Sequence, residues 1–142
     1  MSITSANITF LLAIPGVFDT PQQIQKFYTD DIFSTEPIPS AEAIMGVDGK
    51  KAAGFIYALV PMSVQLMADS PSNDVFDAWI ASQKAIQDSI DANGIVIYPS
   101  LGKKWTMTNG TLTLYPPTPN AGKVLAGRKY TITWESMDPS PI

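Results

Sequence analysis

The sequence of 142 residues contains neither cysteine nor histidine. Without cysteine there is no disulfide framework and no thiolate chemistry. Without histidine the chain lacks the commonest general base and the commonest transition-metal ligand. Charged residues make up only 15% of the chain and hydrophobic residues 45%. This composition argues against disorder and predicts one folded domain over residues 1–142.

The net charge of −4 disfavours general nucleic-acid binding. The charge is also unevenly distributed. Residues 1–100 carry 4 basic and 11 acidic side chains, whereas residues 101–142 carry 5 basic and 2 acidic ones. Such a split is common on solvated faces, but it would also suit a molecule with two opposite poles that associates head to tail.

The apolar run Ile8–Ile14 lacks the basic flank and the cleavage site of a signal peptide, and it is too short to cross a bilayer. Because apolar residues alternate over Asn7–Ile14, we predict a buried strand there. We expect a soluble protein that is made in the cytoplasm and has no membrane partner.

Three Thr-x-Thr triplets stand out among the residues that are present. In a strand each triplet places two hydroxyls on one face and an apolar side chain on the other. The pair Asn109-Gly110 separates two triplets and predicts a two-residue hairpin turn that would place Thr108 opposite Thr111. The hydroxyl-bearing face then consists of Thr106, Thr108, Thr111, Thr113, Thr131 and Thr133. The opposite, core face consists of Trp105, Met107, Leu112, Leu114, Tyr130, Ile132 and Trp134.

A second hairpin turn is predicted at Asp48-Gly49, between Glu42–Val47 and a long apolar strand over Ala53–Met67. Pro61 within that strand indicates an edge or a bulge. A weaker strand is predicted over Gln23–Thr29. The segment 30–41 has no periodicity, and we expect it to be a long loop that is functional or mobile.

One helix is predicted over residues 71–92, because Ser70-Pro71 is a typical helix start and Asn93-Gly94 a typical end. A strand over Ile95–Tyr98 follows, the last strand is expected over Val124–Glu135, and the tail 137–142 is expected to be flexible. Residues at helical spacing form one apolar stripe for core packing: Val75, Phe76, Trp79, Ile80, Gln83, Ile86 and Ile90.

The sequence contains no motif for catalysis, cofactor binding or metal binding. The acid pairs Asp74/Asp77 and Asp88/Asp91 fit a solvated helix face. We therefore expect a protein that is not an enzyme and needs no cofactor. A carbohydrate- or receptor-binding β-sandwich of a virion or baseplate remains the alternative, although Trp105 and Trp134 are predicted to be in the core.

The order of elements resembles the tail tube proteins of contractile-tailed phages, in the superfamily that includes the type VI secretion tube. The resemblance covers roughly Asn7 to Glu135. It depends on the hairpin at Met45–Gly49, the strand into Gln65–Met67, the Ser-Pro start of the helix, and the closing sequence Tyr130–Glu135.

The resemblance implies a mainly β α+β fold, an antiparallel sandwich or barrel with long hairpins and one flanking helix. Copies would form homohexameric rings with a continuous inner β-barrel, stacked head to tail inside a sheath protein. DNA and a tape-measure protein would pass through the lumen, and baseplate and terminator proteins would bind the ends of this virion tail. The six threonines would face the lumen or a neighbouring subunit. The candidate inter-ring loop comprises Asp30, Asp31, Ile32, Phe33, Glu36 and Glu42.

Overall fold

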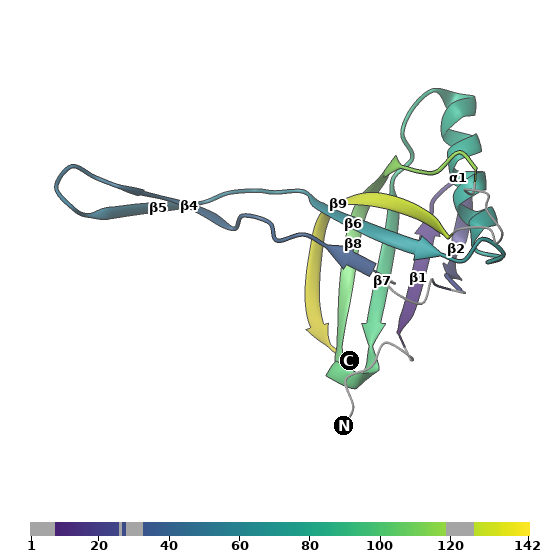
Figure 1. Cartoon of the computed structure of the whole chain (residues 1–142), viewed down its shortest axis with the longest axis horizontal. Coiled ribbons are helices and arrows are strands. Elements are labelled where there is room, and N and C mark those ends of the chain that lie inside the picture. Colours follow the sequence, from purple (N-terminus) through teal and green to yellow (C-terminus); the bar gives the residue numbers. More distant parts are fainter. Residues whose placement is uncertain (1–7, 26, 28–32, 119–126) are drawn as a thin grey trace.

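The computed structural model describes residues 8–25, 27, 33–118 and 127–142. Most of these residues lie in antiparallel strands, and one α-helix packs beside them (Figure 1). The strands are β1 (Thr9–Ile14), β2 (Phe18–Gln23), β3 (Phe33–Thr35), β4 (Ala41–Met45), β5 (Lys51–Phe55), β6 (Val60–Leu66), β7 (Ala92–Tyr98), β8 (Lys103–Leu114) and β9 (Arg128–Pro141). The helices are α1 (Asn73–Ile86) and a short 3₁₀ turn (Pro99–Leu101).

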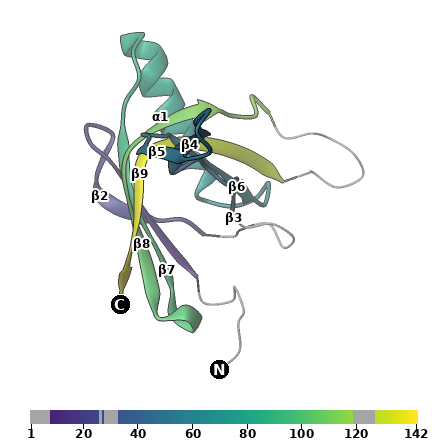
Figure 2. The same cartoon turned by 90° about the vertical axis from the view of Figure 1, so that its left-hand side faces the viewer.

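Among the described residues, seven strands form one sheet in the order β2-β1-β7-β8-β9-β6-β3, and β4 and β5 form a separate two-stranded sheet. The predicted mainly β, antiparallel α+β class with one flanking helix is therefore confirmed. The sheet is open rather than closed into a barrel, because its end strands β2 and β3 do not pair with each other. It curves strongly (Figure 2), so that Phe33 on β3 reaches Phe10 on β1 with ring centroids 5.4 Å apart.

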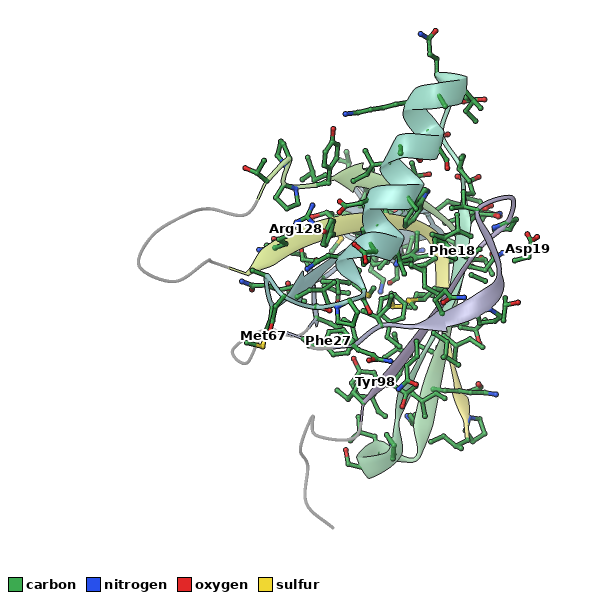
Figure 3. The ribbon with its side chains drawn as sticks, turned by 90° about the vertical axis from the view of Figure 1, so that its right-hand side faces the viewer. Phe18, Asp19, Phe27, Met67, Tyr98 and Arg128 are labelled. Carbon is green, nitrogen blue, oxygen red and sulfur yellow. The ribbon has the colours of Figure 1, made fainter. Side chains whose placement is uncertain are left out.

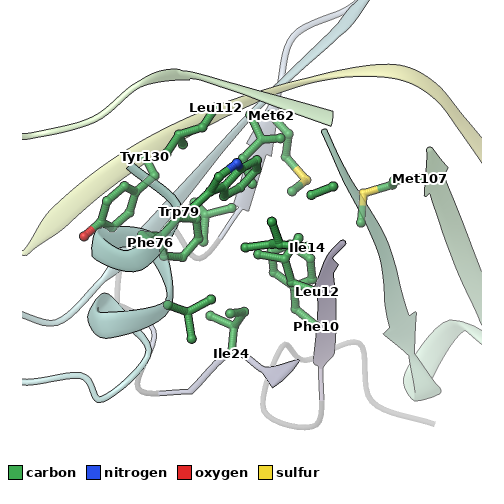
Figure 4. Packing of buried hydrophobic residues seen from close by; sticks show 14 of the residues in the cluster. Phe10, Leu12, Ile14, Ile24, Met62, Phe76, Trp79, Met107, Leu112 and Tyr130 are labelled. Carbon is green, nitrogen blue, oxygen red and sulfur yellow. The ribbon is translucent and has the colours of Figure 1, made fainter. Parts of the chain in front are cut away.

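The core lies between the curved sheet and α1 (Figure 4). Phe76 of α1 stacks on Tyr130 of β9 with ring centroids 4.1 Å apart. The Tyr130 hydroxyl donates to Asn73 Oδ1 at 3.1 Å, and burial raises the pKa of Tyr130, so this group stays a neutral donor.

The predicted core faces of the strands are largely confirmed, except that Leu114 is 65% exposed and Trp105 is only partly buried. Fully buried strand residues include Phe10, Leu12, Ile14, Met107, Tyr130, Ile132 and Trp134.

Helix α1 is shorter than the predicted range 71–92 because the chain reverses direction after Ile86. Gln87 adopts the left-handed conformation, with φ 55°, and Ile86 is exposed. The indole N–H of Trp79 donates to the carbonyl of Ile90 at 2.8 Å, which holds the returning chain against the helix. The helix is also tied to the sheet by Arg128 of β9, whose guanidinium lies 2.9 Å from the Asp77 carboxylate (Figure 3).

The predicted hairpin at Asn109-Gly110 is wrong, because β8 runs through both residues. Met107 pairs with Gly94 and Gly110 with Ala92, so β8 has one residue more than β7 over this stretch. This is a β-bulge. Asn109 takes the left-handed φ of 48°, and its backbone N–H donates to Asn93 Oδ1 at 3.3 Å. Asn-Gly suits this bulge as it suits a hairpin turn, because Asn and Gly readily adopt the left-handed backbone conformation that both structures require.

Three further predictions are corrected by the strand pairing. The expected flexible tail 137–142 instead continues β9 as far as Pro141, which pairs with Lys103 of β8. The expected long strand over 53–67 is divided into β5 and β6. Of the segment 23–29, only Gln23 lies in a strand, at the end of β2; residues 26, 28 and 29 lie outside the described residues. In the predicted last strand, residues 124–126 also lie outside them.

Pro61 lies where its missing N–H is tolerated. It pairs with Thr133 of β9, whereas the pairing of β6 with β3 begins one residue later, at Met62. The predicted edge-like position is therefore confirmed, because no strand of the described residues pairs on that side of Pro61.

Candidate functional site

The six threonines of the triplets lie on the side of the sheet opposite to the core. Along β9, Thr131 and Thr133 alternate with the fully buried Ile132 and Trp134. Thr111 on β8 pairs directly with Thr133, so the two strands present their hydroxyls together. We call the surface formed by Thr106, Thr108, Thr111, Thr113, Thr131, Thr133 and the neighbouring Ser63 of β6 the hydroxyl face.

The hydroxyls of this face bond largely to one another. The Thr113 and Thr133 oxygens are 3.2 Å apart, and those of Ser63 and Thr131 are 3.5 Å apart. Thr108 pairs in the same way with Ser136 of β9. Mutual bonding of this kind restrains the side chains and reduces the number of donors and acceptors available to a passing ligand.

Few charged side chains lie on the hydroxyl face: the exposed Asp138 of β9 pairs directly with Thr106, and the others lie at its borders. The Thr111 hydroxyl donates to Asp91 at 3.0 Å, and the exposed Glu135 accepts from Asn109. The strand alternation places Lys104 of β8 and Lys129 of β9 on the same side of the sheet, near the two ends of the face. The face therefore presents polar, uncharged side chains over most of its area.

The second notable surface is a hairpin formed by β4 and β5, which projects from the body of the molecule (Figure 1). We call residues 41–55 the arm. All of its residues are exposed, including the large apolar side chains of Ile44, Met45 and Phe55. An isolated two-stranded ribbon is at best marginally stable in water. A ribbon of this kind with exposed apolar side chains is therefore suited to binding another protein surface.

The turn of the arm is defined by local hydrogen bonds. The Gly46 N–H donates to the Lys50 carbonyl at 2.8 Å, and the Lys50 N–H donates to Asp48 Oδ1 at 3.1 Å. Gly49 has φ 81°, a conformation that favours glycine. The predicted hairpin at Asp48-Gly49 is therefore confirmed, and the strands leading to it hold the arm as an extended ribbon.

The structure divides the predicted inter-ring loop into separate parts. Phe33 lies in β3, where its ring packs against Phe27 with centroids 5.0 Å apart, so it is not part of a free loop. Glu36 is exposed in the segment leading to the arm, and Glu42 is exposed on β4. The candidates Asp30, Asp31 and Ile32 lie outside the described residues. The sequence analysis predicted the hairpin of the arm, but not that it projects from the body with all its residues exposed.

Within the described residues, no cluster of three or more acidic side chains is placed to hold a metal ion. In the same part of the chain, neither helix has the length and apolar composition needed to span a bilayer.

Comparison with known proteins gives one family and several similar folds. The model of the family tail fiber protein gp32 matches residues 1–138. A chain of the sheath/tube terminator of an extracellular contractile injection system, PVC, is 12% identical over 99% of this chain and 97% of that chain, with a TM-score of 0.66. A chain of the tube-terminating cap of the anti-feeding prophage is 9% identical over 100% of this chain and 93% of that chain, with a TM-score of 0.61. A chain of the 6-fold symmetrised baseplate of the same prophage is 11% identical over 99% of this chain and 97% of that chain, with a TM-score of 0.59. No curated protein sequence matches. The predicted resemblance to the tail-tube superfamily is confirmed at the level of the fold.

Proposed function

The chain belongs to the tail fiber protein gp32 family, and we propose that it is a non-enzymatic structural protein of a contractile tail whose copies associate into rings around a conduit. The observation that carries this proposal is the combination of a largely uncharged hydroxyl face with a projecting apolar arm, on a fold shared with a sheath/tube terminator.

In the proposed ring, hydroxyl faces of neighbouring copies line the lumen. Side chains of Lys or Arg across a lumen would hold DNA by binding its phosphates. Threonines that bond to one another offer neither charge nor many free donors. The border of the face carries charges of both signs, with Asp91 and Glu135 on one hand and Lys104 and Lys129 near its two ends on the other, so no continuous band of positive charge crosses it. A wall of this composition would let DNA and a tape-measure protein pass without specific binding.

The proposed assembly is a homohexameric ring that stacks head to tail, with a sheath outside and with baseplate and terminator proteins at its ends. The arm is the candidate contact between copies, because exposed apolar side chains such as those of the arm are usually buried in a protein–protein interface. As a virion tail component assembled in the host cytoplasm, the protein would meet these partners before the tail is complete.

A second candidate role is that of a terminator, a ring that ends the tube rather than extending it. The matches to a PVC sheath/tube terminator and to an anti-feeding prophage cap, each over nearly the whole chain, favour this role. A glycan-binding module is less well supported. It would need exposed aromatic rings on the hydroxyl face, whereas Trp134 is buried and Trp105 lines the other side of the sheet.

Electron microscopy of the purified protein tests the proposed function. We expect hollow rods if the protein forms the tube and single or paired rings if it forms a terminator. The projection of either should show one central opening. Monodisperse monomers at protein concentrations up to about 100 μM would contradict the proposal, since this concentration lies far above the dissociation constants of stable assemblies.

Lysine on the hydroxyl face should slow DNA passage. In a phage carrying the double substitution Thr113→Lys and Thr133→Lys, each ring would gain a band of positive charge, and we expect DNA ejection measured by dye fluorescence to slow by about tenfold or more at low salt. Raising the salt concentration should restore much of the rate. Ala81→Lys on the exposed face of α1 adds charge elsewhere and should not change ejection. Equal ejection rates in both variants would place the hydroxyl face outside the lumen.

A further inference from the structure

A cavity of about 250 Å³ opens on the core-facing side of the sheet, where no residue of α1 lines it. Strands from both halves of the sheet contribute its wall, from β3 at the edge to β7, β8 and β9. The principal lining side chains are Phe33, Met62, Tyr98, Trp105, Met107 and Met137.

The wall of this cavity is suited to an aromatic ring. Three methionines can adapt their shape and make favourable contacts between sulfur and a ring. Tyr98 and Trp105 already pack edge to face, with centroids 5.1 Å apart. Burial raises the pKa of Tyr98, so its hydroxyl is neutral. A cavity of roughly 150 Å³ is large enough for benzene, and this one exceeds that volume. At its rim, Thr35, which pairs with Met62 on the core-facing side, supplies a hydroxyl group.

Two aromatic side chains of the same chain are exposed to solvent. Phe55, at the end of the arm strand β5, is 73% exposed, and Tyr57, just beyond it, is 94% exposed. Their rings pack edge to face at 5.0 Å and so form a pair of defined shape. Neither side chain lines the cavity of its own copy, and the arm points away from the sheet (Figure 1).

We propose that the cavity of one copy receives Phe55 from the arm of a second copy, with Tyr57 against Thr35 at the rim. The inference deepens the proposed function, because it names the contact that joins copies. Aromatic residues that enter apolar pockets are the side chains on which the affinity of an interface mostly depends.

The position of the cavity supports a second copy as the occupant. It is bordered by β3, the last strand of the sheet, whose outer edge is not paired by another strand of the described chain. An extended segment such as β5 can lie along an edge of this kind while its side chains enter adjacent pockets. Because the arm and the cavity are different surfaces, each copy gives one contact and receives another. Such contacts produce a ring or a stack.

The first test compares two arm variants by sedimentation velocity over a range of concentrations. The double substitution Phe55→Ala and Tyr57→Ala should weaken self-association by about 30-fold or more, since aromatic anchors are common hot spots. The matched variant Ile44→Ala and Val47→Ala removes exposed apolar groups from the same arm. It should weaken self-association by less than about threefold. Circular dichroism confirms that both variants fold. Equal weakening would overturn the assignment of the aromatic pair.

The second test uses the absence of cysteine from the chain. Protein with Tyr57→Cys is mixed with protein carrying Thr35→Cys and treated with a short bis-maleimide. We expect a cross-linked dimer in this mixture and little in a mixture of Tyr57→Cys with Thr113→Cys, which lies on the hydroxyl face. Comparable cross-linking in both mixtures would overturn the proposed contact.

The outcomes separate this inference from the proposed function. If the wild type remains a monomer, both are wrong. If the wild type assembles and the Phe55/Tyr57 variant assembles equally well, only the cavity assignment is wrong. If that variant instead loses binding to purified sheath protein while its self-association is unchanged, the cavity belongs to another partner and the inference is overturned.

Discussion

Replacing the arm, residues 41–55, by Asn-Gly is expected to leave a folded protein that no longer self-associates. Ser40 and Ile56 are already joined by a backbone hydrogen bond of 3.2 Å, so a two-residue turn can connect them. Full burial of an apolar side chain such as Phe55 stabilises a contact by about 1.5–3 kcal/mol. Loss of two such contacts corresponds to a loss of affinity of about 100-fold or more. Sedimentation equilibrium would measure this change directly.

The body should tolerate this deletion because the arm contributes little to its core. In the part of the chain that the structure describes, no arm residue belongs to the core cluster, and β4 and β5 pair with each other apart from the main sheet. We expect the melting temperature to change by less than about 4 °C, the shift that about 1 kcal/mol produces in a domain of this size. A control with Val47→Ser keeps the full arm and should associate like the wild type. An armless protein that still forms rings would show that copies associate through another surface.

The faces of the strands could be predicted from the sequence because alternation is a local property. Phe10, Leu12 and Ile14 are buried as their spacing indicates, and Thr131 and Thr133 lie opposite to Ile132. A strand that is buried on one face must keep this register whatever its neighbours are. The hydroxyl face was therefore recognisable before its position in the sheet was known.

The order of the strands and the arm could not be predicted in the same way. Asn109-Gly110 satisfies a left-handed backbone conformation in a bulge as well as in a turn, and the pairing of β8 with β7 and β9 on both sides of these residues decides between them. Ile44, Val47 and Phe55 have the apolar character of core residues, yet all three are exposed. Their exposure depends on where the hairpin leaves the body, which is a tertiary property that local patterns do not contain.

Adding a single methyl group at Gly110 is expected to destabilise the fold strongly. A Cβ at this position would overlap Cε3 and Cζ3 of Trp134 and lie 2.9 Å from Cγ2 of Ile132. Both side chains are fully buried and have no free space to move into. Gly110→Ala should therefore cost about 3 kcal/mol of the free energy of unfolding, the upper part of the range for overpacked cores. Urea unfolding followed by tryptophan fluorescence measures this loss.

Gly54→Ala provides the matched control, because a Cβ at that position of the arm has no atom within 4 Å. It should change the free energy of unfolding by less than about 0.5 kcal/mol. The double variant Gly110→Ala with Trp134→Phe tests the cause, since the smaller ring gives the new methyl group room. Its destabilisation should be smaller than the sum of the two single losses, as expected for residues in contact. Strict additivity would mean that the two positions do not touch, and the bulge would then lie elsewhere on β8.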